Sequence, residues 1–175
     1  LNEGEQFKVG KVNISGELPL ERDFFEKLIN IQEGSTYSES IITSYEDFFA
    51  NILGNEGYTF AEIDGVPTIS SEEKITDITF VFNPGRKNYT RRVIFRGNDF
   101  TTDEVLRREM RQFEGAPASN QLIEQSKLFL ERTGYFKTVS VETVPVPGEE
   151  DKVDVVFDVE EQQYGNIIGG FSYSQ

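Results

Sequence analysis

The sequence contains two copies of one structural unit, and this internal repeat constrains the fold more than any other feature. The matching segments are residues 12–16 and 93–97, the Glu-Gly pairs at 33–34 and 114–115, and the Gly-Tyr pairs at 57–58 and 134–135. The first two pairs lie 81 positions apart and the last pair 77, so the first copy holds four additional residues in between. Because four residues make about one helical turn, the insertion lengthens a helix without turning its buried face away. We therefore expect two tandem units of roughly 80 residues each.

Each copy has the hydrophobic pattern of one strand, two helices and two further strands. In the second copy, alternation predicts a strand at 91–96 and helical spacing predicts a helix at 103–113. Ser119 is the predicted N-cap of the second helix, Gly134 ends it, and two β segments follow. The corresponding positions in the first copy are 7–15, 22–31, Ser38 and Gly57. The predicted fold class is α+β: two tandem β-α-α-β-β units, each a three-stranded sheet with two helices on one face.

The composition excludes several kinds of chemistry. The chain has no Cys and no His, which rules out catalytic thiolates, zinc sites built on those residues, and triads with an imidazole base. Its 31 acidic and 17 basic residues give a net charge of −14, so nucleic acid is not an expected partner. No Gly-rich phosphate loop follows a strand and opens a helix. We therefore predict a protein that is not an enzyme and takes no cofactor.

Two acidic clusters leave calcium binding as a remote alternative. They are residues 149–151 and the group that Asn98-Asp99 forms with Asp103-Glu104. Neither cluster has the spacing of an EF-hand loop, so solvated turn and helix-cap residues are the favoured interpretation. A carboxylate-based hydrolase remains an equally remote alternative.

The second strand of each unit is predicted to lie at a free edge of its sheet. The candidate segments are 60–63 and 138–143. An exposed edge presents unpaired N–H and C=O groups, which can accept an extended segment as an added strand. The alternative is an ordinary edge that Glu62 or Glu142 protects. The residues alone leave both interpretations open.

The helix predicted at 103–113 carries a second candidate binding surface. One stripe of this helix is apolar and is predicted to be core: Leu106, Met110 and Phe113. A stripe rotated by about 100° is charged: Arg107, Arg111 and Glu114. Glu114 would end the helix, where the macrodipole disfavours a carboxylate by about 0.3–1 kcal/mol, so helix stability does not explain it. A weak pair with Arg111 and a patch that faces a partner protein are the two alternatives.

Residues 164–175 belong to neither copy. They are Gly-rich and end in alternating aromatic and polar residues, with Phe171 and Tyr173 as the aromatic members. This pattern is typical of a transmembrane β-strand. The sequence therefore predicts that residues 164–175 begin the first strand of a membrane barrel.

Four segments resemble one known family. They are 105–116 with its Leu-Arg-Arg-Glu-Met-Arg run, Gly134-Tyr135-Phe136 followed by Val139, 144–148, and 151–155. Together they resemble the POTRA domains of the BamA family of outer-membrane β-barrel assembly factors, strongly over 90–175 and more loosely over 6–88. The resemblance implies that residues 1–88 form a fourth-like POTRA domain and 89–163 the fifth, barrel-proximal one. It also implies that 164–175 start the first barrel strand.

The resemblance implies a location and a role. Such proteins lie in the outer membrane of Gram-negative bacteria, with their POTRA domains on the periplasmic side. A C-terminal barrel, missing from this sequence, would embed the full-length protein in that membrane. The implied role is a scaffold that binds accessory lipoproteins and guides unfolded outer-membrane protein precursors for insertion.

The resemblance also implies where the partners bind. A BamD-like helical-repeat lipoprotein would contact Arg107, Arg111 and Glu114, and other lipoproteins of the assembly machinery would bind elsewhere. Unfolded outer-membrane protein segments would pair with the edge strand formed by Thr138, Val139, Ser140, Val141, Glu142 and Thr143. The alternative is the POTRA arm of a translocation-type or Tam-type transporter, in which we do not expect the Leu-Arg-Arg-Glu-Met-Arg run.

Overall fold

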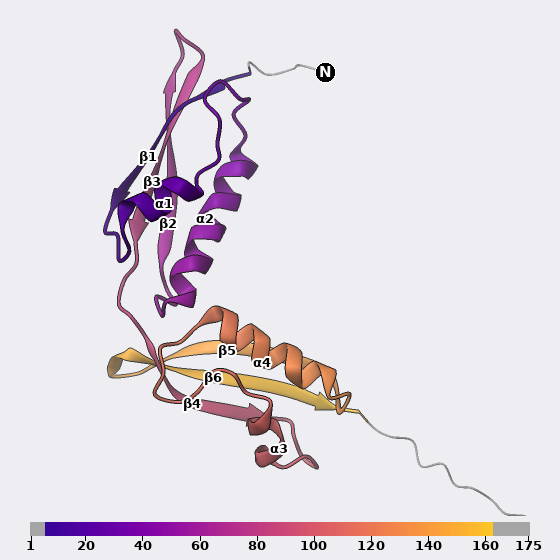
Figure 1. The fold of residues 1–175 in the computed structure, drawn as a ribbon. Coiled ribbons are helices and arrows are strands. Elements are labelled where there is room, and N and C mark those ends of the chain that lie inside the picture. The colour runs from indigo at the N-terminus through magenta and orange to yellow at the C-terminus, as the bar shows by residue number, and fades with distance from the viewer. Residues whose placement is uncertain (1–5, 163–175) are drawn as a thin grey trace, which may run out of the picture.

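The computed structural model describes residues 6–162, which form two units arranged end to end (Figure 1). The first unit contains β1 (Lys8–Gly16), α1 (Arg22–Leu28), α2 (Glu39–Asn55), β2 (Glu62–Ser70) and β3 (Ile75–Asn83). The second contains β4 (Tyr89–Arg96), α3 (Asp103–Arg108), α4 (Asn120–Arg132), β5 (Phe136–Val146) and β6 (Glu149–Glu161). Each unit therefore has the predicted order of elements.

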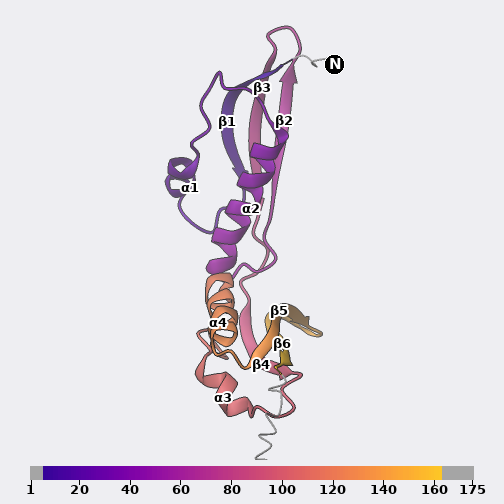
Figure 2. The same cartoon turned by 90° about the vertical axis from the view of Figure 1, so that its right-hand side faces the viewer.

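A three-stranded mixed sheet forms the base of each unit. The strand orders are β1-β3-β2 and β4-β6-β5. The first and last strands of a unit pair in parallel, whereas the last two strands form an antiparallel hairpin. Both helices of a unit lie on the same face of its sheet (Figure 2). The predicted fold class, two tandem α+β units, is confirmed.

The repeat reappears in the backbone contacts of the two units. The Val9 N–H donates to the Ser35 carbonyl at 2.8 Å, and 81 positions later the Thr90 N–H donates to the Ala116 carbonyl at 2.9 Å. α2 has 17 residues and α4 has 13, so the four additional residues of the first copy lengthen this helix. The two copies thus share one fold and differ by about one helical turn.

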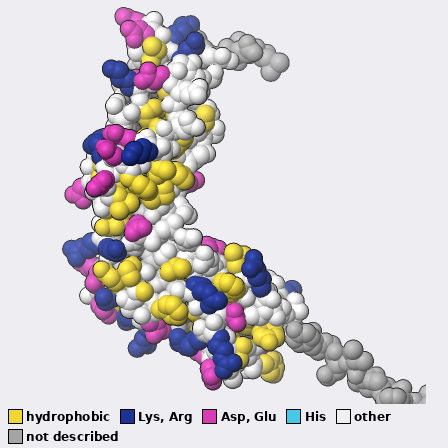
Figure 3. Space-filling model, viewed as in Figure 1, with side chains coloured by type: hydrophobic (Ala, Val, Ile, Leu, Met, Phe, Trp, Pro, Cys, Tyr) yellow, Lys and Arg dark blue, Asp and Glu magenta, His cyan; other side chains and the backbone are white. Residues whose placement is uncertain are grey.

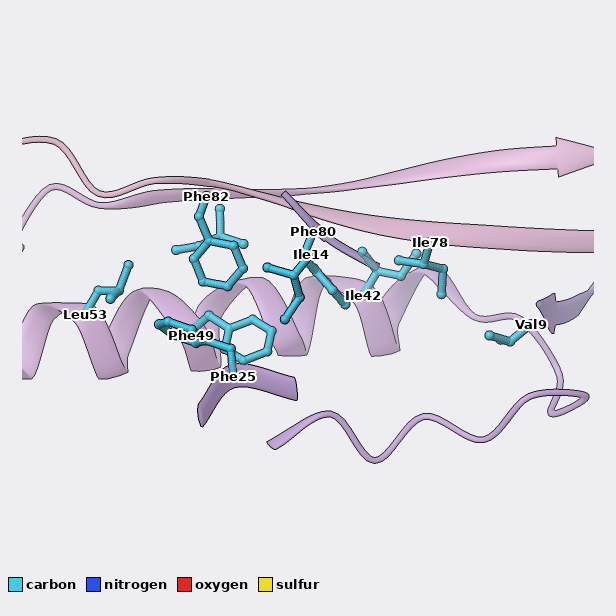
Figure 4. Close-up of a cluster of buried hydrophobic side chains, with 10 residues drawn as sticks. Val9, Ile14, Phe25, Ile42, Phe49, Leu53, Ile78, Phe80 and Phe82 are labelled. Carbon is cyan, nitrogen blue, oxygen red and sulfur yellow. The ribbon is translucent and has the colours of Figure 1, made fainter. Parts of the chain in front are cut away.

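Each unit buries its own hydrophobic core between the helices and the sheet. Three rings from three elements meet at the centre of the first core, those of Phe25, Phe49 and Phe82 (Figure 4). The ring centres of Phe25 and Phe82 lie 4.8 Å apart, and those of Phe49 and Phe82 lie 5.2 Å apart. The second core centres on Val155 and Phe157, which are fully buried. Because the two clusters share no residue, each unit is stabilised by its own core.

The two units meet where the end of α2 approaches the start of α4. The Gln121 N–H donates to Asn55 Oδ1 at 2.9 Å, and the Asn88 N–H donates to the Gly57 carbonyl at 2.8 Å. Asn88 is 3% exposed, and its side chain donates to the Arg86 carbonyl at 3.0 Å. The first of these bonds joins the units directly, and Asn88 fastens the short connector between β3 and β4 to both, because its carbonyl also accepts the Ala118 N–H at 3.0 Å.

The first helix of each unit is shorter than predicted. In both units, a hydroxyl of the second helix accepts a hydrogen bond from a backbone N–H just past the end of the first. Tyr45 Oη accepts from Asn30 at 3.0 Å, and Ser126 Oγ accepts from Arg111 at 2.8 Å. Because these N–H groups bond outside their own helix, α1 and α3 do not continue. The predicted helices at 22–31 and 103–113 are therefore wrong in length.

Candidate protein-binding surfaces

An ion pair lies on the outer edge of β4, the edge that faces away from β6. Arg107 of α3 and Glu114 of the following loop pair at 3.4 Å between Nη1 and Oε1. Both side chains also bind the backbone of Val93 in β4: its N–H donates to Glu114 Oε1 at 2.9 Å, and its carbonyl accepts from Arg107 Nη2 at 3.2 Å. The side chains of Arg107 and Glu114 are 48% and 44% exposed. The pair is thus anchored to a strand while remaining half open to solvent.

A hollow of about 320 Å³ adjoins this ion pair. It is lined by Val93, Arg107, Met110, Gln112, Phe113 and Glu114. Leu106 and Met110 are buried as predicted, whereas Phe113 is 64% exposed. An exposed aromatic ring beside an arginine and a small hollow is a combination typical of the energetically important centres of protein interfaces.

The prediction that Phe113 belongs to the core is wrong. The neighbouring Gln112 takes the inward position instead and is fully buried. Its Oε1 accepts a hydrogen bond from the Ser119 N–H at 2.9 Å. The repeat contained a signal for this, because the residue 81 positions before Phe113 is the polar Gln32.

Arg111 does not join the ion pair. Because α3 ends before it, Arg111 and Glu114 do not lie on a helix, and the predicted continuous stripe with Glu114 at a helix C-terminus is wrong. The Arg111 guanidinium lies 4.2 Å from the centre of the Phe129 ring of α4. The three predicted residues therefore form two groups, the Arg107–Glu114 pair on β4 and Arg111 against α4.

β5 lies at the opposite edge of the same sheet. The predicted edge residues 138–143 all lie in β5 and, within the described part of the chain, pair with β6 alone. Among the hydrogen bonds of residues 6–162, none joins the backbone of 138–143 to a loop or to a side chain. Glu142 Oε1 lies 4.0 Å from Nη1 of Arg96 in β4, so this carboxylate points across the sheet face and away from the free edge.

The model of the POTRA family, described as a surface antigen variable number repeat, matches residues 7–85 and 88–162. The chain belongs to the POTRA family. The two matched segments cover most of the chain, and each contains one of the β-α-α-β-β units.

Several relatives of these POTRA units are BamA proteins. The chain is 35% identical to outer membrane protein assembly factor BamA of Neisseria meningitidis, over 95% of the chain and 21% of that protein. It is 33% identical to BamA of Nitratidesulfovibrio vulgaris, over 99% of the chain and 22% of the relative. The chain thus spans about a fifth of the length of these curated relatives.

Solved structures of BamA proteins share the fold of both POTRA units. The crystal structure of Haemophilus influenzae BamA POTRA3-5 matches with a TM-score of 0.84 and 37% identity, over 91% of this chain and 63% of that one. BamA of Haemophilus ducreyi lacking POTRA domains 1-3 matches with a TM-score of 0.79 and 32% identity, over 89% and 30%. The predicted resemblance to the BamA family is confirmed, and with it the location at the periplasmic side of the outer membrane of a Gram-negative cell.

The acidic clusters considered for calcium are paired within the POTRA units. Glu150 lies 2.7 Å from Arg86, and Asp103 accepts a hydrogen bond from Asn98 at 2.9 Å. Within residues 6–162, no three acidic side chains gather as a metal site. A helix with the length and hydrophobicity needed to cross a membrane does not occur in that range either.

A second exposed phenylalanine lies beyond the end of β4. Phe100 is 92% exposed in the loop before α3. The Glu161 carboxylate fastens this loop to β6, because it accepts the Thr101 N–H at 2.7 Å and the Phe100 N–H at 3.0 Å. Hydrogen bonding by the Thr101 side chain, assisted by these two backbone N–H groups, lowers the pKa of Glu161 below its ordinary value. Phe100 is thus an exposed ring outside the hollow beside Glu114.

The helical face of the first POTRA unit carries an apolar patch. Phe24 of α1 and Ile41 and Phe48 of α2 are 41–43% exposed. Figure 3 shows hydrophobic side chains gathered in the middle of this unit. The first unit therefore has an exposed apolar surface of its own, unlike the mixed charged and aromatic surface of the second.

Proposed function

We propose that this chain is a periplasmic scaffold of an outer-membrane β-barrel assembly machine. It binds accessory lipoproteins and guides unfolded outer-membrane protein precursors for insertion, with no enzymatic step of its own. The observation that carries the proposal is the placement of two different surfaces on the second unit. The Arg107–Glu114 pair and the open backbone of β5 lie at opposite edges of one sheet, so one unit can hold two partners.

The surface at β4 is the proposed site of a BamD-like helical-repeat lipoprotein. Val93 holds the Arg107–Glu114 pair in place, so a partner need not pay the entropy of ordering these side chains. Phe113 supplies an aromatic anchor beside the pair, and Arg111 extends the surface toward α4. The first unit has Glu26 at the position of Arg107, so the lipoprotein docks on the second unit.

The edge of β5 is the proposed site of unfolded precursors. An extended chain would hydrogen-bond to the free backbone of residues 138–143 and add a strand beside β5. Pairing of this kind reads the backbone more than the side chains, which suits a scaffold that handles many different precursors.

The two units occupy the barrel-proximal end of the periplasmic arm in this proposal. Residues 1–88 are the fourth-like POTRA domain and 89–163 the fifth, supported by the similarity to Haemophilus influenzae BamA POTRA3-5. The apolar patch around Phe48 offers a site for a further lipoprotein of the machinery. The barrel strand predicted at 164–175 lies outside the described residues and stays a prediction.

Calorimetric titration of the chain with the BamD-like lipoprotein of the same genome tests the proposal. We expect binding at about micromolar affinity or tighter. Phe113→Ala should weaken it by about tenfold, because the ring is exposed in the free chain and becomes buried in the complex.

The matched control is Phe100→Ala, which removes an even more exposed ring outside the proposed surface. This variant should bind like the wild type. Absence of binding by the wild type, or equal affinities for Phe113→Ala and Phe100→Ala, would contradict the proposed lipoprotein site.

A further inference from the structure

β2 is an edge strand of the first unit, as β5 is of the second. Among residues 6–162, β2 pairs only with β3, in an antiparallel register that runs without a bulge from Glu62 to Ser70. The Gly65 N–H donates to the Glu46 side chain and therefore points away from β3. In an antiparallel ladder, alternate residues face the same side, so the outward positions of β2 are Ile63, Gly65, Pro67 and Ile69.

The Glu46 carboxylate covers one of these outward positions. Its Oε1 accepts the Gly65 N–H at 2.6 Å, so the donor is already used. Glu46 reaches the strand because α2 packs directly over Gly65, where an added Cβ would collide with the Ile42 side chain. Figure 1 shows α2 running beside β2. The glycine and the carboxylate act together: the absence of a side chain at 65 lets the helix approach closely enough for Glu46 to bind the edge.

The next outward position is Pro67, which has no N–H to donate. Two successive outward positions in the middle of β2 thus offer no N–H to an incoming chain: the donor of Gly65 is occupied, and Pro67 has none. The strand would otherwise attract one, because Val66 and Ile69 are 46% and 58% exposed. An exposed apolar edge with free donors is a site of strand addition and aggregation, and proteins often block it with a charge or a proline.

We propose that Glu46, together with Pro67, closes the β2 edge to extended chains and so leaves β5 as the edge that receives precursors. The contrast with β5 supports this, because the backbone of 138–143 has no equivalent side-chain contact among residues 6–162. Glu46 is then a specificity-determining residue of the scaffold. This inference rests on the proposed binding of extended chains at β5.

Amide hydrogen exchange followed by NMR tests this proposal on the 175-residue chain. The probe is a soluble peptide of about ten residues in which Tyr or Val alternates with Thr, the pattern of a barrel strand. The variants are Glu46→Ala and the double variant Glu46→Ala/Pro67→Thr. Asp47→Ala is the matched control, because Asp47 is the exposed neighbour of Glu46 on α2.

In the wild type and in Asp47→Ala, the peptide should slow exchange in 138–143 and leave Ile69 unchanged. In the double variant it should slow exchange of both Gly65 and Ile69 by about tenfold or more, since the edge then offers its donors. Without peptide, Gly65 should exchange about tenfold faster in Glu46→Ala than in the wild type. Unchanged signals from β1 and β3 would show that the fold is intact.

Two results would overturn the closure of β2: peptide protection of Ile69 in the wild type, or no protection of β2 in the folded double variant. A different result would contradict the proposed precursor site at β5 while leaving the closure of β2 intact. If the peptide leaves 138–143 unprotected in every variant but protects β2 in the double variant, Glu46 closes its edge while β5 is not the precursor site.

Discussion

Replacement of Gly97 by alanine should lower the free energy of unfolding of the second unit by about 3 kcal/mol or more. Gly97 follows β4 with a φ of +82°, a left-handed conformation that costs a residue with a Cβ about 1–2 kcal/mol. An added Cβ would also collide with the backbone carbonyl oxygen of Val159 in β6. Because that oxygen belongs to the central strand, β4 must shift away from β6 to make room. The expected loss therefore combines backbone strain with damaged strand packing.

Gly115→Ala separates these two contributions. Gly115 has almost the same φ, +83°, but an added Cβ there would meet nothing within 4 Å. It should cost only the strain of the left-handed backbone, about 1–2 kcal/mol. Urea unfolding followed through the amide NMR signals of the second unit measures both values. Equal losses in the two variants would show that contact with Val159 contributes nothing.

Glu114→Lys should weaken lipoprotein binding by about a hundredfold, the largest effect expected for a single change on this surface. The substitution replaces the carboxylate of the proposed lipoprotein site with a cation and places that cation beside Arg107. It also removes the acceptor of the Val93 N–H, which should cost about 1–2 kcal/mol of stability in the second unit. If Glu114 ended a helix, as the sequence suggested, the lysine would instead stabilise the unit, because a cation is favourable at a helix C-terminus.

Glu114→Gln distinguishes the binding role from the structural one. The amide oxygen can still accept the Val93 N–H, so stability should stay within about 0.5 kcal/mol of the wild type. Loss of the charge should still weaken binding by about tenfold. Glu104→Gln, which neutralises an exposed carboxylate paired with Arg108, is the control and should bind normally. Calorimetry and urea unfolding measure the two effects. Normal binding by Glu114→Gln would leave Glu114 as a structural residue of the β4 edge.

The sequence predicted the fold because the repeat supplied each element twice. The 81-residue offset aligned the strands, and the four-residue insertion correctly implied a longer second helix in the first unit. The ends of the first helices were not predictable in the same way. They depend on Tyr45 and Ser126, which lie 15 residues further along the chain and meet the first helix only after folding. The spacing of apolar residues within a helix does not predict contacts with residues this far along the chain.

The sequence drew attention to Arg107, Arg111 and Glu114 but did not predict how their side chains are arranged. Helical spacing favoured a pair between Glu114 and Arg111, three residues apart, whereas the structure pairs Glu114 with Arg107. The pairing depends on a loop that returns to the edge of β4, where Val93 orients both side chains. The hydrogen bond between Glu46 and Gly65 was also missed, since these residues are brought together only when α2 packs on the sheet.

The central claim is that the second unit can bind a lipoprotein at β4 and a precursor at β5 at the same time, and a competition titration would test it directly. The opposite edges of the second sheet are separated by two strand spacings, about 10 Å, so the lipoprotein at β4 should not cover β5. The barrel-strand peptide is titrated by calorimetry into the chain alone and into the chain saturated with the BamD-like lipoprotein. Equal affinities within about twofold are the predicted result for a scaffold with separate sites. Displacement of the lipoprotein by the peptide, or an affinity weakened by about tenfold or more, would contradict the account.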